Sequence, residues 1–249
     1  MKDSPIYSRL PQLLAGMLAL SVALVLSSWI GAKAIRDVKQ ANDVLVVTGS
    51  ARRPIRSDYL IWTLSVSSQQ PTAREAYRDL TAQMAQVRAY LKEQRVPEDA
   101  ITTKAIETMS IPELTPNGQD TGQILAYRLT QRLEIRSSDV DRYTELSKRS
   151  TELIERGINL VSEPPQYLYT GLDKLRVEMM AEAAKDAKAR AEAIAGSTGN
   201  RVGTVRDAKT GVFQITARNS TDVSDSGIYD TSSIEKDITA VVSVTFGID

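Results

Sequence analysis

The first feature along the chain is an apolar run, LLAGMLALSVALVLSSWI, which covers residues 13–30 without a charged side chain. A helix rises 1.5 Å per residue, so this run would extend over about 27 Å, close to the roughly 30 Å hydrocarbon thickness of a bilayer. Trp29 stands at its end, where interfacial aromatic side chains are common. The pattern predicts a transmembrane helix at 13–30, between a short N-terminal tail at 1–12 and a linker at 31–42.

Three interpretations of this run compete. A buried core helix would usually show a polar stripe, which the run lacks. A cleaved signal peptide is compatible with Ala32-Lys33-Ala34, but the run exceeds the roughly 7–15 apolar residues typical of signal peptides. We therefore predict an uncleaved single-pass anchor. Lysines and arginines flank the run on both sides, so the positive-inside rule does not assign its orientation.

From Asp43 onward the pattern becomes that of a folded domain, which we expect to cover residues 43–249. Period-two alternation, typical of strands with one buried face, recurs along it. The alternation is most regular in the strand expected at 125–137, and it closes the chain between Ile238 and Phe246. Further strands are expected at 44–50, 59–67, 101–113, 159–169, 201–206 and 211–217.

Three amphipathic helices separate these strands. The first is expected to begin at Thr72, with Glu75 in capping-box spacing. Its apolar stripe consists of Ala73, Tyr77, Leu80, Met84, Val87 and Leu91. The second is expected at 139–156, capped by Gly157. The third, at 172–195, carries a stripe of small side chains that would allow close approach to a sheet: Ala184, Ala187, Ala191 and Ala195.

Prolines and polar runs mark the interruptions between these elements. Arg52-Arg53-Pro54 is expected to interrupt the first strand, Asn117-Gly118 to form a turn, and residues 218–233 to form an exposed loop. Hairpins mixed with helices indicate an α+β fold, with a mixed, mainly antiparallel sheet covered on one face by about three amphipathic helices. They argue against a doubly wound parallel sheet.

The composition excludes several kinds of chemistry. The 249 residues include no histidine and no cysteine. Histidine-dependent triads, cysteine nucleophiles, disulfides and zinc sites built from these residues are therefore excluded. Oxygen-ligand sites for hard cations remain open, and we expect no cofactor. The 31 basic and 31 acidic residues balance and only 5% are aromatic, so the chain has no electrostatic footprint for nucleic acid.

A row of arginines occupies one face of the strand expected at 125–137: Arg128, Arg132 and Arg136. This row could contact an anionic partner such as a lipid headgroup or an acidic polymer, or it could be a solvated face balanced by neighbours such as Glu134. A second basic group follows the apolar run by some twenty residues and could meet anionic lipid if the intervening segment is short in space. It consists of Arg52, Arg53 and Arg56.

Enzymatic alternatives rest on weaker patterns. A hydrolase with paired carboxylates is the class that the composition readily permits. Four glutamates lie on or beside expected strands, but no spacing pairs any two of them: Glu107, Glu113, Glu134 and Glu163. A Ser–Lys dyad also stays open, although we assign no S-x-x-K motif to the chain at this point. A phosphate nest is conceivable at Gly196, Gly199 and Gly203, which a helix cap and a strand turn explain equally well.

Several motifs, in order, resemble the SIMPL-domain proteins of bacterial envelopes. Residues 46–50 (VVTGS) resemble the opening strand-and-glycine motif, 71–76 (PTAREA) the Thr-x-x-Glu-Ala helix start, and 96–103 (VPEDAITT) the helix exit. Residues 193–196 (AIAG), followed by 203–205 (GTV), resemble the C-terminal helix and strand. The resemblance covers 43–249. Ser50 departs from it, because the family usually has a second glycine there.

The resemblance implies an α+β domain exported to the periplasm or outer envelope, with ring-like oligomers in some members. It also implies links to stress tolerance without an established catalytic activity. Since the charge pattern is indecisive, the resemblance decides the expected topology: a single pass through the inner (cytoplasmic) membrane, with the C-terminal domain in the periplasm.

Three functional hypotheses follow. The favoured one is a non-enzymatic envelope protein, held in the membrane by residues 13–30, whose SIMPL-like domain self-associates as a homo-oligomeric scaffold in stress protection. The second is a periplasmic ligand- or partner-binding module without an obligate oligomer, which would use the arginine row or residues 218–233. The third is a carboxylate-dependent hydrolase. None of them identifies a small-molecule ligand.

Overall fold

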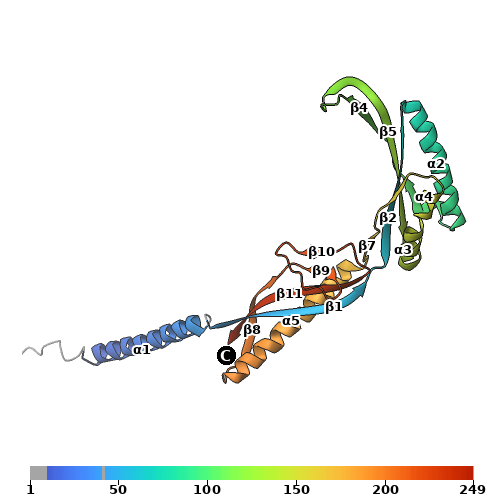
Figure 1. Ribbon diagram of the computed structural model, residues 1–249. Helices are drawn as coiled ribbons and strands as arrows, with labels where there is room; N and C mark the ends of the chain where they lie inside the picture. The colour runs from blue at the N-terminus through green and yellow to red at the C-terminus, as the bar shows by residue number, and fades with distance from the viewer. Residues whose placement is uncertain (1–9, 41–42, 249) are drawn as a thin grey trace, which may run out of the picture. The chain divides into compact units, whose positions relative to one another are not determined.

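The computed structural model describes residues 10–40 and 43–248, with side chains at 15–33 and 43–248. A long helix, α1 (Leu10–Gln40), precedes the folded domain (Figure 1). It contains the predicted span at 13–30 and is longer at both ends, so parts of the predicted tail and linker are helical. The remainder of that tail and linker lies outside the described residues.

Strands and helices alternate after α1, which confirms the predicted α+β class. The helices are α2 (Ala73–Glu93), the short η1 (Glu98–Ala100), α3 (Val140–Arg149), α4 (Glu152–Glu155) and α5 (Leu172–Ser197). The strands of the first half are β1 (Val44–Arg56), β2 (Tyr59–Gln70), β3 (Ile101–Thr103), β4 (Glu107–Leu114) and β5 (Asp120–Ser137). Those of the second half are β6 (Leu160–Ser162), β7 (Gln166–Leu168), β8 (Val202–Thr210), β9 (Gln214–Ala217), β10 (Ile228–Tyr229) and β11 (Glu235–Ile248).

The described residues divide into two compact units and two sheets. Residues of 1–51, 180–211 and 241–249 form the first unit, and 52–179 with 212–240 form the second. One sheet has the order β1-β11-β9-β10, with β8 paired to β11. The other has the order β3-β5-β2-β6, with β4 paired to β5 and β7 to β2. The hydrophobic pattern was interpreted as a single sheet, and the structure corrects this to two.

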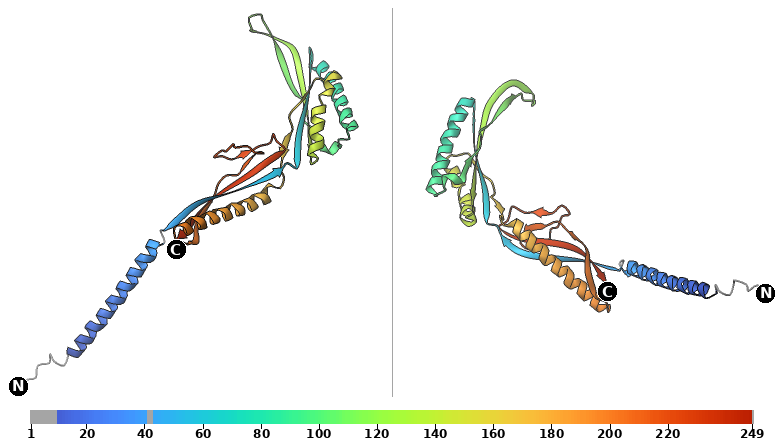
Figure 2. Two further views of the ribbon diagram at one scale, coloured as in Figure 1. Left: turned by 60° about the horizontal axis from the view of Figure 1, so that its bottom comes forward. Right: turned by 180° about the vertical axis from the view of Figure 1, so that it is seen from behind.

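Strand β2 shows how the sheet of the second unit is covered on one face. Its burial alternates along the strand, and Leu60, Trp62, Leu64 and Val66 are completely buried. These side chains share one hydrophobic core with those of α2 and α3, which lie on the same side of the sheet (Figure 2). The indole nitrogen of Trp62 donates to Ser162 Oγ at 3.0 Å, so this buried polar atom is satisfied. The prediction of one covered face is confirmed for this sheet.

The predicted start of α2 is also confirmed. The Glu75 amide donates to Thr72 Oγ1, and the Thr72 hydroxyl donates to the Glu75 carboxylate at 2.8 Å. The predicted stripe is wrong in its first turn, because Ala76 is buried there while Ala73 and Tyr77 are exposed. From Leu80 onward the predicted stripe is buried, joined by Tyr90.

Strand β1 runs without a break through Arg52-Arg53-Pro54, so the predicted interruption is wrong. β1 lies at the edge of its sheet, with β11 as its neighbour. A proline is tolerated in an edge strand because one of its sides needs no ladder hydrogen bonds. At Ser57 and Asp58 the chain instead passes from β1 in one sheet to β2 in the other.

Other predicted segments are subdivided, among them 159–169, which forms β6 and β7. Residues 101–113 form two strands, β3 and β4, which both pair with β5. Residues 139–156 form α3 and α4, followed by Gly157 at a φ of +80°. The predicted loop at 218–233 contains β10, which pairs in parallel with β9. The predicted turn at Asn117-Gly118 is confirmed, with Gly118 at a φ of +77°.

The first unit contains an unusually close contact between a strand and a helix. A Cβ placed on Gly49 of β1 would lie 2.2 Å from the Ala183 carbonyl oxygen and 2.3 Å from the Ala187 nitrogen. Beside it, the Ser50 amide donates to the Asp186 carboxylate at 2.8 Å, and this bond lowers the pKa of Asp186. The small side chains that permit the approach are Ala183, Ala187, Ala191 and Ala195, so the predicted stripe was wrong at Ala184.

We expect Gly49→Ala to destabilise the protein strongly. The added methyl group overlaps helix backbone, which cannot rotate away as a side chain could, so one of the two elements must shift. Overpacking of this kind typically costs about 1–3 kcal/mol, and the measurement is chemical denaturation of the full-length protein.

Gly196→Ala is the matched control, because Gly196 lies in the same helix that contacts Gly49, and no atom lies within 4 Å of the position that its new methyl group would take. Alanine also has a helix propensity up to about 1 kcal/mol better than glycine. Gly196→Ala should leave the stability unchanged or raise it. Equal stability of the Gly49→Ala variant and the wild type would contradict the close contact.

Candidate functional site

The predicted arginine row lies on the face of the β3-β5-β2-β6 sheet opposite the one that packs on α2 and α3. Side chains alternate between the two faces of β5. Leu129, Leu133 and Ile135 are buried on one face, and the arginines, at even-numbered positions, point to the other. Residues in a strand are about 3.4 Å apart, so arginines four residues apart are separated by about 14 Å. We call Arg128, Arg132 and Arg136 the arginine face.

Each arginine of this face has a partner on its own or a neighbouring strand. Arg128 donates from Nε and Nη2 to the Gln69 amide oxygen, at 3.2 and 2.8 Å. Arg132 forms an ion pair with Glu107. Arg136 donates to Glu134 at 2.6 Å, so Glu134 does balance one end of the row as suggested. Arg128 differs from the other two, because its partner is neutral and it forms no ion pair with a carboxylate in the part of the chain that the structure describes.

Glu134 is the least exposed charged group here. Burial raises its pKa, but hydrogen bonds from Arg136 and from Lys104, whose Nζ lies 3.2 Å away, outweigh burial and hold the pKa below its ordinary value. Glu134 is therefore ionised at neutral pH and serves as a fixed anion between two cations. A carboxylate held in this way is a poor general acid.

The glutamates considered for hydrolysis do not form a pair. Strand register places Glu107 opposite Thr130, four residues from Glu134 and hence about 14 Å along β5. Paired catalytic carboxylates lie about 5–9.5 Å apart. Glu113 accepts a hydrogen bond from Thr121, and Glu163 is exposed beside β6. Among the described residues, no group of three or more acidic side chains could hold a metal ion.

The second basic group is also paired with carboxylates. Arg52 meets Asp237 at 2.5 Å, Arg53 meets Glu178 at 2.7 Å, and Arg56 meets Asp141 at 2.5 Å. These residues all belong to the second unit. Their ion pairs connect the end of β1 to β11, α5 and α3, which gives the group a structural role. Contact with lipid stays a prediction.

Two of the glycines considered as a phosphate nest, Gly196 and Gly199, form a helix cap, and the third, Gly203, lies in β8. Gly199 has a φ of +80° and follows α5. The amide of Gly199 donates to the Gly196 carbonyl, and that of Asn200 donates to the Ala195 carbonyl. These amides are used within the turn and cannot also point at a phosphate, so the helix-cap interpretation holds.

One cluster was overlooked in the sequence, although its spacing is visible there. Ser233 and Lys236 form an S-x-x-K pattern, the spacing of a Ser–Lys nucleophile pair in some hydrolases. Lys236 is 1% exposed, and its Nζ donates to Asp230 at 3.1 Å and to the Ser233 carbonyl. The Ser233 hydroxyl also donates to Asp230. We call Asp230, Ser233 and Lys236 the lysine cluster.

The protonation states in the lysine cluster oppose nucleophilic catalysis. Burial raises the pKa of Asp230, but hydrogen bonds from Ser233, Ser232 and Lys236 outweigh burial, and the pKa lies far below its ordinary value. The Lys236 ammonium donates to this carboxylate and to the Ser233 carbonyl, and the Ser233 hydroxyl donates to the same carboxylate, so Lys236 serves as the cation of an ion pair and not as a base for Ser233. Burial lowers the pKa of Lys236, and its ion pair with Asp230 opposes that shift. The cluster instead fixes the segment that enters β11.

We expect Asp230→Asn to cost on the order of 3 kcal/mol of unfolding free energy at neutral pH, because it leaves the Lys236 charge buried without its partner. The native pKa of Asp230 is depressed, so the stabilisation is present above the unfolded pKa of about 3.9 and is lost as pH falls below it. The difference between the two proteins should therefore shrink between pH 5 and pH 2, as measured by denaturation at each pH.

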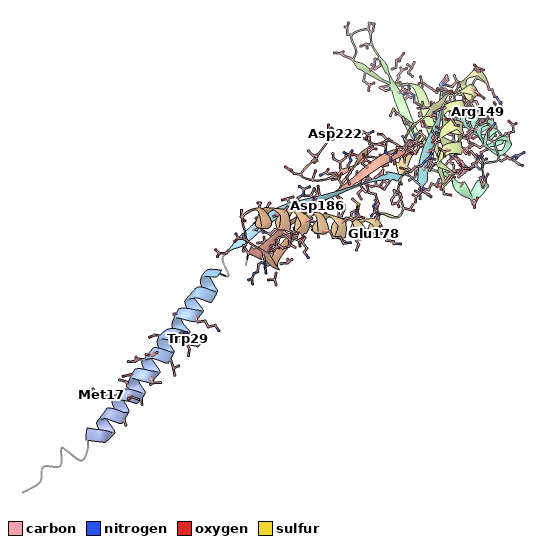
Figure 3. All side chains as sticks on the ribbon, turned by 90° about the horizontal axis from the view of Figure 1, so that it is seen from below. Met17, Trp29, Arg149, Glu178, Asp186 and Asp222 are labelled. Carbon is pink, nitrogen blue, oxygen red and sulfur yellow. The ribbon has the colours of Figure 1, made fainter. Side chains whose placement is uncertain are left out.

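Asp222→Asn is the matched control, since Asp222 is exposed (Figure 3) and bonded to Ser220 alone among the described residues. It should change stability little. Replacing both charges by Asp230→Asn with Lys236→Met should restore most of the loss, because no unpaired charge remains. A full-size penalty from Asp230→Asn at pH 2 would contradict the ion pair.

Comparison with known proteins assigns the chain to a family. No curated protein matches it. Among solved structures it is similar to an amidase of the hydantoinase/carbamoylase family from Burkholderia phymatum, with 12% identity over 55% of this chain and 35% of that chain. The chain thus spans about a third of the amidase, and the TM-score of 0.26 is too low to carry an argument. The family model described as SIMPL, protein of unknown function (DUF541), matches residues 45–246. The chain belongs to the SIMPL family.

Proposed function

We propose that this SIMPL protein is a non-enzymatic envelope protein, held in the inner membrane by α1, with its folded domain in the periplasm. In this proposal the domain self-associates as a scaffold. The periplasmic side and a role in stress protection rest on the family resemblance. The membrane anchor and the self-association are also supported by exposed apolar surfaces of the protein.

The observation that carries the anchor is the exposure of α1. Ala15–Lys33 is long and apolar enough to cross a membrane, and none of it is buried against the rest of the protein. The side chains of Met17 and Trp29 extend from the helix without covering contacts (Figure 3). This exposure argues against a core helix, because core helices bury their apolar side chains. A signal sequence would show the same exposure.

Helix continuity favours an anchor over a cleaved signal. The small-x-small pattern at 32–34 lies inside α1, which continues to Gln40 without a break. Proteolysis is easiest in exposed segments without regular structure, and a continuous helix offers no such segment.

Self-association is supported by the outer part of the β4–β5 hairpin, residues 109–125, which we call the hairpin arm. It projects past the region of the sheet that α2 covers (Figure 2). Four of its large apolar side chains are half or more exposed: Met109, Leu114, Ile124 and Leu125. Large apolar side chains exposed on a projecting element are typical of contact surfaces in soluble domains.

The chemistry of the arm favours a second copy that packs through side chains. Pro112 and Glu113 lie in β4, which forms one of the two free edges of the arm. Proline and charge at an edge oppose the addition of another strand through backbone hydrogen bonds. Apolar side chains from an identical arm would bury this surface without requiring such bonds, as in a self-complementary interface.

A periplasmic binding module is the second candidate. The neutral partner of Arg128 favours it, since this guanidinium retains donors for an anionic group. Such a module needs no oligomer, so oligomeric mass separates it from the scaffold.

The test of the anchor is Leu24→Arg combined with Val25→Arg. Each charge near the centre of a span opposes insertion by about 2.5–3.5 kcal/mol. The wild type should stay with membranes through an alkaline carbonate wash and give the intact mass of the 27.3 kDa chain. The double variant should be released or fail to insert.

Leu24→Val combined with Val25→Leu is the control, because it keeps the span apolar and should leave retention unchanged. Release of the wild type by the wash would overturn the anchor. So would a mature chain that begins near residue 35, since the helix would then be a removed signal.

A further inference from the structure

The second unit contains a cavity of about 320 Å³ that none of the functions above uses. Three segments surround it: the first turns of α5, the chain entering β9, and the chain around β10. Its lining consists of Arg176, Val212, Phe213, Ile215, Ser226, Gly227, Ile228 and Tyr229. We call it the Arg176 cavity.

Arg176 is the charged group of this cavity. Its guanidinium carbon lies 5.9 Å from the centre of the Phe213 ring, which holds the guanidinium over an aromatic face. Within 4.0 Å the structure gives it one carboxylate among the described residues, Asp173 at 3.6 Å, which is fully exposed to water. An exposed pair at this distance contributes little, so the guanidinium keeps hydrogen-bond donors for another partner.

The other residues that line the cavity are mostly apolar, and the segments that carry them lie close together. Phe213 and Ile215 lie two residues apart, and the parallel pairing of β9 with β10 sets Ile215 beside Tyr229. Gly227, at a φ of +85°, lets its segment approach the chain opposite, because a Cβ there would lie 2.9 Å from the Phe213 carbonyl oxygen. Ser226 also lines the cavity and is its one hydroxyl-bearing residue besides Tyr229.

These features define a ligand by size and charge. The volume equals about ten water molecules at 30 Å³ each and lies at the lower end of the range for small-molecule sites. A single guanidinium matches one carboxylate, which it can bind through two parallel hydrogen bonds. No other cationic side chain lines the cavity, and the aromatic and aliphatic walls suit an apolar group of about ten non-hydrogen atoms.

We propose that the Arg176 cavity binds a small monocarboxylic acid with an apolar body, its carboxylate on the Arg176 guanidinium and its body against Phe213 and Tyr229. This site is independent of the anchor and of self-association. A multiply charged anion would lack partners here, and a neutral apolar molecule would leave the guanidinium unused.

The two phenylalanines of the chain permit a direct test. Phe213 lines the cavity, whereas Phe246 is buried in the first unit and serves as an internal reference. The full-length protein in detergent, labelled with 4-fluorophenylalanine, is titrated with 3-phenylpropanoate and with its neutral isostere 3-phenylpropanamide. The ¹⁹F signal of Phe213, assigned through Phe213→Leu, reports binding, and empty micelles correct for partitioning.

The acid should shift the Phe213 signal saturably and leave the Phe246 signal in place, and it should bind at least tenfold more tightly than the amide. Arg176→Gln should weaken binding of the acid at least tenfold, because it removes the charged partner. Arg149→Gln, an exposed arginine on α3, is the matched control and should bind as the wild type does.

Three results would overturn the proposal. They are equal binding of acid and amide, unchanged affinity of Arg176→Gln, and no saturable shift of Phe213 at about 10 mM acid. Denaturation of Arg176→Gln at the wild-type midpoint shows that the second unit of the variant is folded, so its loss of binding is not a loss of structure.

Discussion

The close approach of α5 to β1 at Gly49 is the contact on which the first unit depends. Where the helix meets the strand it presents Ala183 and Ala187, and the strand presents no side chain at all. The Ser50 amide adds a hydrogen bond to Asp186 across the same contact. This packing gives a physical reason for the glycine in the VVTGS segment, which carries part of the resemblance to the SIMPL family. The hydrogen bond uses the Ser50 backbone, so it does not depend on the side chain at this position.

The sheet of the second unit separates packing from exposed chemistry. One face carries the core under α2 and α3, and the other carries the arginine face. Most of the charges on that face are paired locally, and the most deeply buried lysine, Lys236, is satisfied by Asp230 and by backbone. Charge in this unit therefore mainly stabilises the fold. Arg128 and Arg176, whose partners among the described residues are neutral or exposed, are two exceptions, and each adjoins a surface that could receive an anion.

The sequence was sufficient where structure depends on local periodicity. It predicted β5, the capped start of α2 and the alternating strand β11, because side-chain alternation and capping act over a few residues.

The sequence was not sufficient where contacts between residues far apart in the chain determine the structure. The edge position that lets β1 continue through Pro54 depends on pairing with β11, and the helix face that meets Gly49 is shifted from Ala184 to Ala183 by tertiary packing. The S-x-x-K spacing at Ser233 was visible, but its role depends on Asp230, which the pattern does not include. Glu134 could be named as a partner of the arginine face because it lies in the same strand, but Gln69, Glu107 and the Arg176 cavity depend on strand pairing and could not be inferred from composition.

The mass of the detergent-extracted full-length protein, by light scattering during size exclusion, tests the scaffold most directly. We predict an assembly of several uncleaved chains. Leu114→Glu, Ile124→Glu and Leu125→Glu together should reduce it to a single chain, because like charges would meet across the packed arms. Val223→Glu, at a loop residue that is 81% exposed, should leave the mass unchanged. A wild type that is a single uncleaved chain at micromolar concentration would contradict self-association and favour the binding module.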